Sequence, residues 1–194
     1  MQIYPTDSSV PDRLRTEEFW LRPLAPTDNA RDYEAVMATQ ALLRLRGNGD
    51  WPHADFTPEE NLADLEGHEA DFQDRLGFTY TVLDPSGTRC LGCVYVYPLD
   101  EALRRVDADN EPVAGVGDHE AVVWFWVHPD GVPENLDRKL FTELLPWLSD
   151  DFAFARVVFT SWTADERQTS LMREAGLRPV LSHPGSDMHA MYFE

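Results

Sequence analysis

The chain has 194 residues, of which 43% are hydrophobic, with six Trp and ten Phe; this apolar content can offset the entropy of folding and excludes a disordered acidic chain. Sixteen Lys and Arg against 35 Asp and Glu give a formal charge of -19, which would repel nucleic acids and anionic membrane surfaces. An acidic surface would attract a cationic amine, although solubility alone is the commoner reason for it.

The N-terminal segment, "MQIYPTDSSVPDRLRTEEF", lacks the basic and apolar regions of a signal peptide. No apolar run in the chain approaches the roughly 20 residues of a membrane span. No Pro/Ser-rich or low-complexity stretch divides the sequence. We therefore expect a cytoplasmic protein with one domain over residues 1–194, including an N-terminal extension over residues 1–18.

Residues 19–24, "FWLRPL", alternate like a short first strand that ends at a proline. Tyr33, Val36 and Met37 are spaced for one face of a first helix. A second helix is predicted to begin in "FTPEENLADL", because Thr57 and Glu60 form a capping box around a proline at the first helical position.

Two β-rich runs, "FTYTVL" and "CLGCVYVYPL", flank "DPSG" at residues 84–87, and this turn signature predicts an antiparallel hairpin. The second run carries Cys90 and Cys93. Residues i and i+3 of a regular strand point to opposite faces, so we expect two buried, inert thiols. A zinc site would need two more ligands, which nothing nearby in the sequence supplies.

After a polar loop over residues 100–118, "HEAVVWFWVHP" is apolar on both faces and predicts a central strand with helices covering it. A helix follows with one row of leucines, at positions 136, 140, 144 and 148. "ARVVFTSW" predicts another buried strand. The next helix has a capping box at Thr163 and Glu166 and ends at Gly176, and "RPVLSH" and "HAMYFE" are the last two predicted strands.

The resulting order, β-α-α-β-β-β-α-β-α-β-β, resembles that of the GNAT superfamily, whose members transfer an acyl group from acyl-CoA to an amine. The resemblance covers residues 19–194 and is strongest in "LRPLAPTDNARDYEAV", in "GTRCLGCVYVYPL", and from "VHP" through "ADERQTSLMREAGL". It implies an α/β fold with a mixed, mostly antiparallel central sheet and helices on both faces. Positions of the family's late helix motif match Asp165, Gln168, Leu171, Met172, Gly176 and Leu177.

In the family, the fourth strand splays from the fifth and its backbone pairs with the pantetheine arm of CoA. Amides of the following turn then bind the pyrophosphate. The resemblance therefore assigns acetyl-CoA, or another acyl-CoA, to positions in the central strand, the turn and the late helix. These positions are Phe125, Trp126, Val127, Val132, Asn135, Leu136, Asp137 and Asp165.

The turn departs from the family pattern at the positions that bind phosphate. Val132 replaces the family's arginine, and Pro133, Asn135 and Asp137 replace its three glycines. Proline has no N–H to donate, whereas asparagine tolerates the left-handed conformation that glycine provides. A carboxylate about 4 Å from a phosphate charge would cost on the order of 4 kcal/mol at an effective dielectric of 20. Acids in a first helical turn also have a simpler role, because they interact favourably with the helix dipole.

Transfer to an amine needs a base that keeps the nucleophile neutral and often an acid for the leaving thiolate. The resemblance places Met172 where many members have the acidic tyrosine, and Tyr192 on the last strand is the alternative. Glu120 and the adjacent His119, at the start of the central strand, are the candidate bases. The six His show no spacing that predicts a metal site.

Two functions follow. The first is an N-acetyltransferase that transfers an acyl group to a small-molecule or peptide amine. The second is a catalytically inactive GNAT-fold protein that binds a ligand or protein partner in the splayed cleft without binding CoA in the usual way. A homodimer formed through exposed tryptophan is a third expectation.

Overall fold

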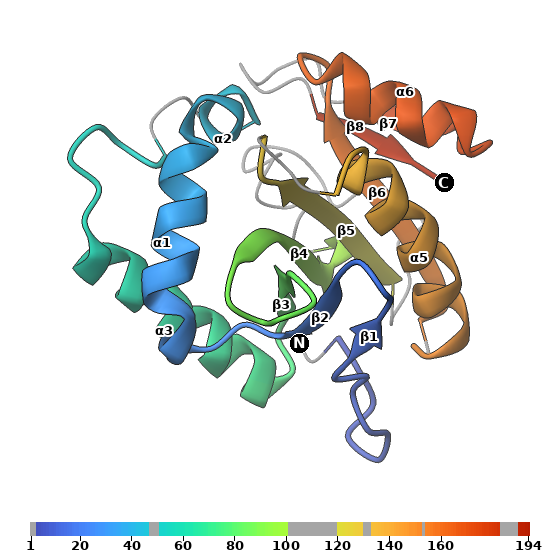
Figure 1. The fold of residues 1–194 in the computed structure, drawn as a ribbon. Helices are drawn as coiled ribbons and strands as arrows, with labels where there is room; N and C mark the ends of the chain where they lie inside the picture. The colour runs from blue at the N-terminus through green and yellow to red at the C-terminus, as the bar shows by residue number, and fades with distance from the viewer. Residues whose placement is uncertain (1–2, 47–50, 101–119, 130–132, 153, 183–189) are drawn as a thin grey trace.

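The computed structural model describes residues 3–46, 51–100, 120–129, 133–152, 154–182 and 190–194 (Figure 1). The strands are β1 (Leu14–Arg15), β2 (Trp20–Pro23), β3 (Phe78–Leu83), β4 (Cys90–Pro98), β5 (Glu120–Val127), β6 (Arg156–Trp162), β7 (Pro179–Ser182) and β8 (Ala190–Phe193). The helices are the 3-10 turn η1 (Pro26–Asp28) and α1 (Asn29–Ala38), α2 (Gln40–Arg46), α3 (Pro58–Asp74), α5 (Leu136–Asp150) and α6 (Glu166–Glu174).

Within these residues, eight strands form one sheet in the order β1-β2-β3-β4-β5-β6-β8-β7. All neighbouring strands are antiparallel except β5 and β6, which are parallel. This confirms the mixed, mostly antiparallel sheet. The sequence did not predict β1, which places part of the N-terminal extension at the sheet edge, and it did not predict α2 as a separate helix.

Local signals produced the elements they predict. The Thr57 hydroxyl accepts a hydrogen bond from the Glu60 amide, and the Glu60 carboxylate accepts one from the Thr57 amide, so the capping box that begins α3 is confirmed. The β3–β4 hairpin is also confirmed: the Gly87 amide donates to the Asp84 carbonyl at 2.9 Å, and Gly87 has a φ of 74°. The predicted loop over 100–118 lies, apart from Asp100, outside the described residues.

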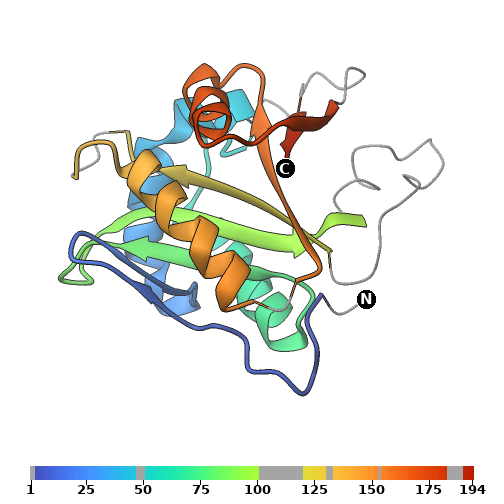
Figure 2. The same ribbon diagram turned by 90° about the vertical axis from the view of Figure 1, so that its right-hand side faces the viewer.

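Helices cover both faces of the sheet, as expected. Figures 1 and 2 show α5 on the opposite side of the sheet from α1 and α3. The predicted leucine row of α5 packs in the largest core cluster with β5 residues Val123 and Phe125. On the other face, Val36 of α1 and Leu65 of α3 pack in a second cluster with Trp126. None of the helices in the described part of the chain is long and apolar enough to cross a membrane.

The parallel pair β5 and β6 creates the feature that positions the site. Their pairing runs from Glu120 opposite Arg156 to Val123 opposite Phe159 and then ends, although both strands continue. On its other edge β6 pairs with β8, from Phe159 opposite Phe193 to Trp162 opposite Ala190. Over residues 124–127, the edge of β5 that faces β6 therefore has no strand partner in the described part of the chain, and the two strands splay as the family resemblance predicts.

Candidate functional site

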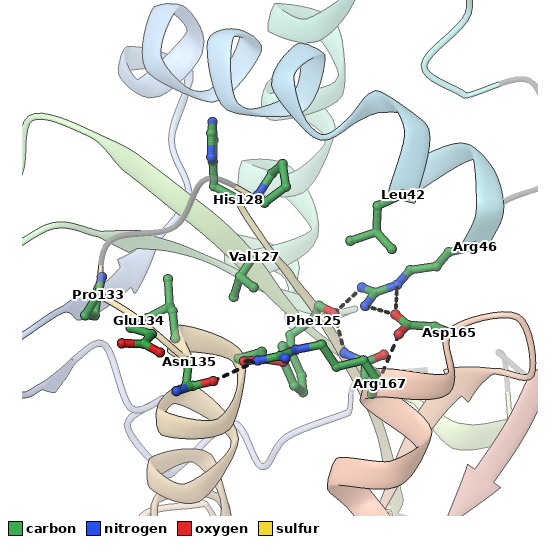
Figure 3. A pocket seen from close by; sticks show the side chains of 14 residues that line it. Leu42, Arg46, Phe125, Val127, His128, Pro133, Glu134, Asn135, Asp165 and Arg167 are labelled. Carbon is green, nitrogen blue, oxygen red and sulfur yellow. Dashed lines mark hydrogen bonds and ion pairs between the residues drawn. The ribbon is translucent and has the colours of Figure 1, made fainter.

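A cleft of about 670 Å³ opens where β5 and β6 separate (Figure 3). Its walls come from α2, the end of β5, the first turn of α5 and the start of α6. Six predicted cofactor positions line it: Phe125, Val127, Asn135, Leu136, Asp137 and Asp165. The structure therefore brings together residues that are up to 40 positions apart in the sequence.

The carbonyl of Phe125 on the exposed edge of β5 already accepts two hydrogen bonds. Arg46 Nη1 donates to it at 2.7 Å, and Gln168 Nε2 donates at 3.0 Å. A carbonyl oxygen has two lone pairs, so both of its acceptor positions are used. This backbone group, which the resemblance assigned to the pantetheine arm, is thus saturated by side chains of α2 and α6.

Arg46 is held in the cleft by a buried ion pair with Asp165, to which both Nε and Nη2 donate (Figure 3). Burial lowers the pKa of Arg46, and the Asp165 charge opposes that shift. Asp165 is also the N-cap of α6, because its Oδ1 accepts a hydrogen bond from the Gln168 amide at 3.0 Å. The predicted capping box at Thr163 and Glu166 is wrong: Asp165 can both cap the helix and pair with Arg46.

The first turn of α5 forms the opposite wall. Asn135 adopts the left-handed conformation, with a φ of 57°, so asparagine supplies the backbone geometry for which the family uses glycine. Asp137 accepts hydrogen bonds from Arg167 at 2.5 and 2.8 Å, and Arg167 also donates to Asn135 Oδ1 at 3.2 Å. Burial acts to raise the pKa of Asp137, but the Arg167 hydrogen bonds and charge and the backbone amides of Arg138 and Asp137 together lower it.

The Arg167 pairing changes the electrostatics expected for the turn. The carboxylate of Asp137 remains charged, yet a guanidinium neutralises it at contact distance. A phosphate near this turn would therefore meet an ion pair rather than an isolated negative charge. Because Arg167 is largely exposed, with 66% of its side chain accessible, it can exchange Asp137 for an anionic ligand.

The remaining predicted positions lie elsewhere. The Trp126 side chain points to the opposite face of β5, where it packs with α1 and α3. Glu120 lies at the start of β5, five residues and about 17 Å of extended strand from Phe125, where its carboxylate is 3.7 Å from Arg156 Nη1. Tyr192 is buried in β8, and burial raises its pKa. Neither Glu120 nor Tyr192 lines the cleft, while His119 and Val132 lie outside the described residues.

Neither Arg46 nor Arg167 has a role predicted from the sequence, and the match of Gln168 to the family's late helix assigns no contact to its side chain. Gln168 follows the N-cap Asp165 by three residues, and this spacing is typical of an amide that the cap binds. No sequence signal indicates that the Gln168 side chain binds the Phe125 carbonyl. Among the described residues, its buried Oε1 has no hydrogen-bond partner, although Gln168 is only 3% exposed and lines the cleft. Arg46 lies in an arginine-rich helix with no spacing that distinguishes it.

The two cysteines form a separate cluster with Asp32 of α1. Leu91 has no partner in β3, and this β-bulge turns Cys90 and Cys93 to the same face of β4. Both thiols approach Asp32 Oδ1, at 3.9 and 3.5 Å, so the prediction of opposite faces is wrong. The hydrogen bond to Cys90, burial and the Asp32 charge raise the pKa of Cys93, as expected for an inert thiol. Within the described residues, the cluster offers three of the four ligands of a structural zinc site.

Comparisons with known proteins establish the fold. No family model and no curated protein sequence matches the chain. Solved structures do match. The ribosomal-protein-S5-alanine acetyltransferase from Vibrio fischeri has a TM-score of 0.68 at 14% identity over 93% of this chain and 94% of that one. The immunity acetyltransferase MccE, solved with acetyl-CoA and AMP, has a TM-score of 0.69 at 12% identity over 92% of both chains. A protein described as a GNAT-family acetyltransferase from Bordetella pertussis has a TM-score of 0.65 at 15% identity over 94% and 98%. The chain therefore has the fold of the GNAT acetyltransferases.

Proposed function

We propose that the protein is an acyl-CoA-dependent N-acyltransferase acting on a small or peptide amine. The observation that carries this proposal is the 670 Å³ cleft, which lies beside the end of β5 that has separated from β6 and is bounded by the N-termini of α5 and α6. Two helix N-termini beside one cleft favour an anionic ligand, because their dipoles point to it.

The residues present can hold the pantetheine arm, but in a modified way. The Phe125 carbonyl is occupied, whereas the buried Gln168 Oε1 beside it has no partner among the described residues. Gln168 can therefore replace the Phe125 carbonyl as the hydrogen-bond acceptor for the ligand. Its Nε2 donates to that carbonyl, and its Oε1 accepts from a ligand N–H. Arg167 can release Asp137 and contact the pyrophosphate, with the Asn135 and Leu136 amides at the start of α5.

The chain's own residues would bind and orient the two reactants, and this positioning lowers the barrier to direct transfer. When bound, acyl-CoA supplies a thioester whose acyl carbon forms a C–N bond with a neutral amine, while its C–S bond breaks and the amine proton ends on the thiol. Burial of the amine lowers its pKa and favours the neutral form. Glu120, which shares the sheet face of Trp124 and Trp126, stays the proposed base that would receive the ammonium proton through solvent, and Tyr192 stays the proposed acid.

The occupied Phe125 carbonyl favours a second candidate, a binding protein that has lost catalysis. If Arg46 and Gln168 hold this carbonyl permanently, an arm that requires it cannot dock. The cleft would then take a different anionic ligand at the two helix N-termini.

Thermal unfolding with and without millimolar acetyl-CoA tests the proposal. A ligand present at 100 times its dissociation constant should stabilise the protein by about 2.7 kcal/mol. Gln168→Leu should weaken this stabilisation, whereas Gln73→Leu, on the exposed face of α3, is the matched control. No stabilisation of the unaltered protein by acetyl-CoA would refute the cofactor. Stabilisation without thiol release from acetyl-CoA in the presence of amines would favour the binding protein.

A further inference from the structure

A second, aromatic pocket of about 130 Å³ adjoins the cleft, and Arg46 lines both. Besides Leu43, its lining consists of Arg46, Tyr95, Trp51, Trp124, Trp126 and Trp162. Four of the six tryptophans of the chain thus surround one small space. This concentration exceeds what core packing alone requires, since Trp51 is 38% exposed and Trp124 and Trp162 are half-buried.

The strands fix the aromatic walls of the pocket. Tyr95 of β4 pairs with Trp124 of β5, and their rings stack at 5.1 Å with an interplanar angle of 6°. Trp126 lies two residues further along the same face of β5, and its Nε1 donates to the Tyr95 hydroxyl at 3.2 Å. Trp162 is the last residue of β6, on the other side of the splay. Flat aromatic faces are therefore held in place before a ligand arrives.

The size and charge of the pocket restrict its occupant. A cavity of about 150 Å³ lined by apolar side chains binds benzene, so 130 Å³ suits one six-membered ring rather than a two-ring system. The lining contains no carboxylate among the described residues, so a polyamine would find no ion-pair partner there. Among the described residues, the charged side chain of the lining is Arg46, which lies 5.8 Å from the centre of the Trp162 ring and is already paired with Asp165, so the lining offers no unpaired carboxylate to a cationic ligand.

We propose that this pocket binds the acceptor and that the acceptor is a primary amine carried on a single aromatic ring. This inference rests on the proposed function, because the pocket meets the acyl-CoA cleft at Arg46. The ring stacks on the tryptophans, and the amine lies at the junction of the two cavities. There, removal from water favours the neutral amine that attacks the thioester. The protein thereby supplies the nucleophile without a strong base at the junction.

The test compares 2-phenylethylamine with n-butylamine, spermidine and tetramethylammonium. Binding of each is measured by calorimetry on the full chain without acetyl-CoA, and acetylation of the three primary amines is followed by thiol release. We expect 2-phenylethylamine to bind and to show a KM at least tenfold below that of n-butylamine. Equal or better use of n-butylamine or spermidine would overturn the proposal, as would tighter binding of tetramethylammonium, which would indicate a cage for cations.

Variants separate the pocket from general effects on the fold. Trp162→Leu should weaken 2-phenylethylamine binding at least tenfold, while Trp20→Leu, a half-buried tryptophan on β2 outside the pocket, should leave it unchanged. Trp124→Leu provides a second pocket variant, and urea unfolding establishes that each variant is folded. Unaltered binding in both pocket variants would overturn the proposal. If acetyl-CoA stabilises the protein but no aromatic preference appears, this inference fails alone. If acetyl-CoA does not bind, the proposed function fails and the acceptor role fails with it.

Discussion

Replacing Arg46 by methionine should destabilise the protein by about 3 kcal/mol, at the lower end of the cost of breaking a buried ion pair. Arg46 and Asp165 are 9% and 8% exposed, so the Asp165 carboxylate would stay buried without its counter-ion. The cost stays at the lower end because Asp165 keeps the Gln168 amide and the Phe125 carbonyl keeps the Gln168 side chain. For a chain of this length, about 3 kcal/mol lowers the melting temperature by roughly 6–12 °C.

Urea denaturation of the single and double variants measures this effect. In Arg46→Met with Asp165→Asn, asparagine still caps α6 but carries no charge, so the double variant should recover at least half of the lost stability. A loss below about 1 kcal/mol in the single variant would contradict a desolvated pair. A double variant no more stable than the single one would show that packing of the Arg46 stem, not the unpaired charge, sets the cost.

Three further outcomes follow from the structure. Asp137→Asn should raise acetyl-CoA affinity about tenfold, because it frees Arg167 from its ion pair for a charge-assisted hydrogen bond to the phosphates, which contributes about 1.5 kcal/mol; unchanged affinity in calorimetry would place the phosphates elsewhere. Burial raises the pKa of Asp32, so the protonated carboxyl stabilises the folded protein at low pH, and this contribution to the unfolding free energy is lost as pH rises from about 4 through the raised value. The unfolding free energy of Asp32→Asn relative to the unaltered protein should therefore increase over that window, and a pH-independent difference would contradict it. Gly92→Ala should cost more than about 2 kcal/mol, because the added Cβ would lie 2.1 Å from the Trp126 carbonyl oxygen, whereas Gly67→Ala, with open space in α3, should stabilise by about 0.5–1 kcal/mol; equal effects in urea denaturation would refute this.

Elements whose signals are local could be predicted from the sequence. The Thr57–Glu60 box and the turn at residues 84–87 involve partners only three residues apart, so the residues that form them are visible in one short stretch. The leucine row of α5 is equally local, because a helix repeats every 3.6 residues. The family resemblance then supplied the mixed, mostly antiparallel sheet and the place of the splay.

The contacts that define the cleft could not be predicted, because they join distant segments. Arg46 meets Asp165 across 119 positions and the Phe125 carbonyl across 79. Arg167 reaches Asp137 across 30 positions. The sequence alone therefore overstates the negative charge that a phosphate would meet at the turn. The two cysteines illustrate the same limit at short range: one extra residue, Leu91, reverses the strand alternation on which the opposite-face prediction depended.

Side-chain hydrogen-bonding groups take the place of backbone groups at both the turn and the strand edge. The family's glycine loop holds the pyrophosphate through backbone amides, and here Pro133 removes one donor while Asp137 introduces a negative charge. Arg46 and Gln168 instead add side-chain donors at the strand edge, and Arg167 adds one at the turn. Side chains can move on binding, unlike the backbone of a β-strand, so a cleft built from them gives its ligand a different set of partners from a glycine loop. Acyl-CoA affinity in this protein should accordingly depend on Gln168 and Arg167 more than on the turn backbone.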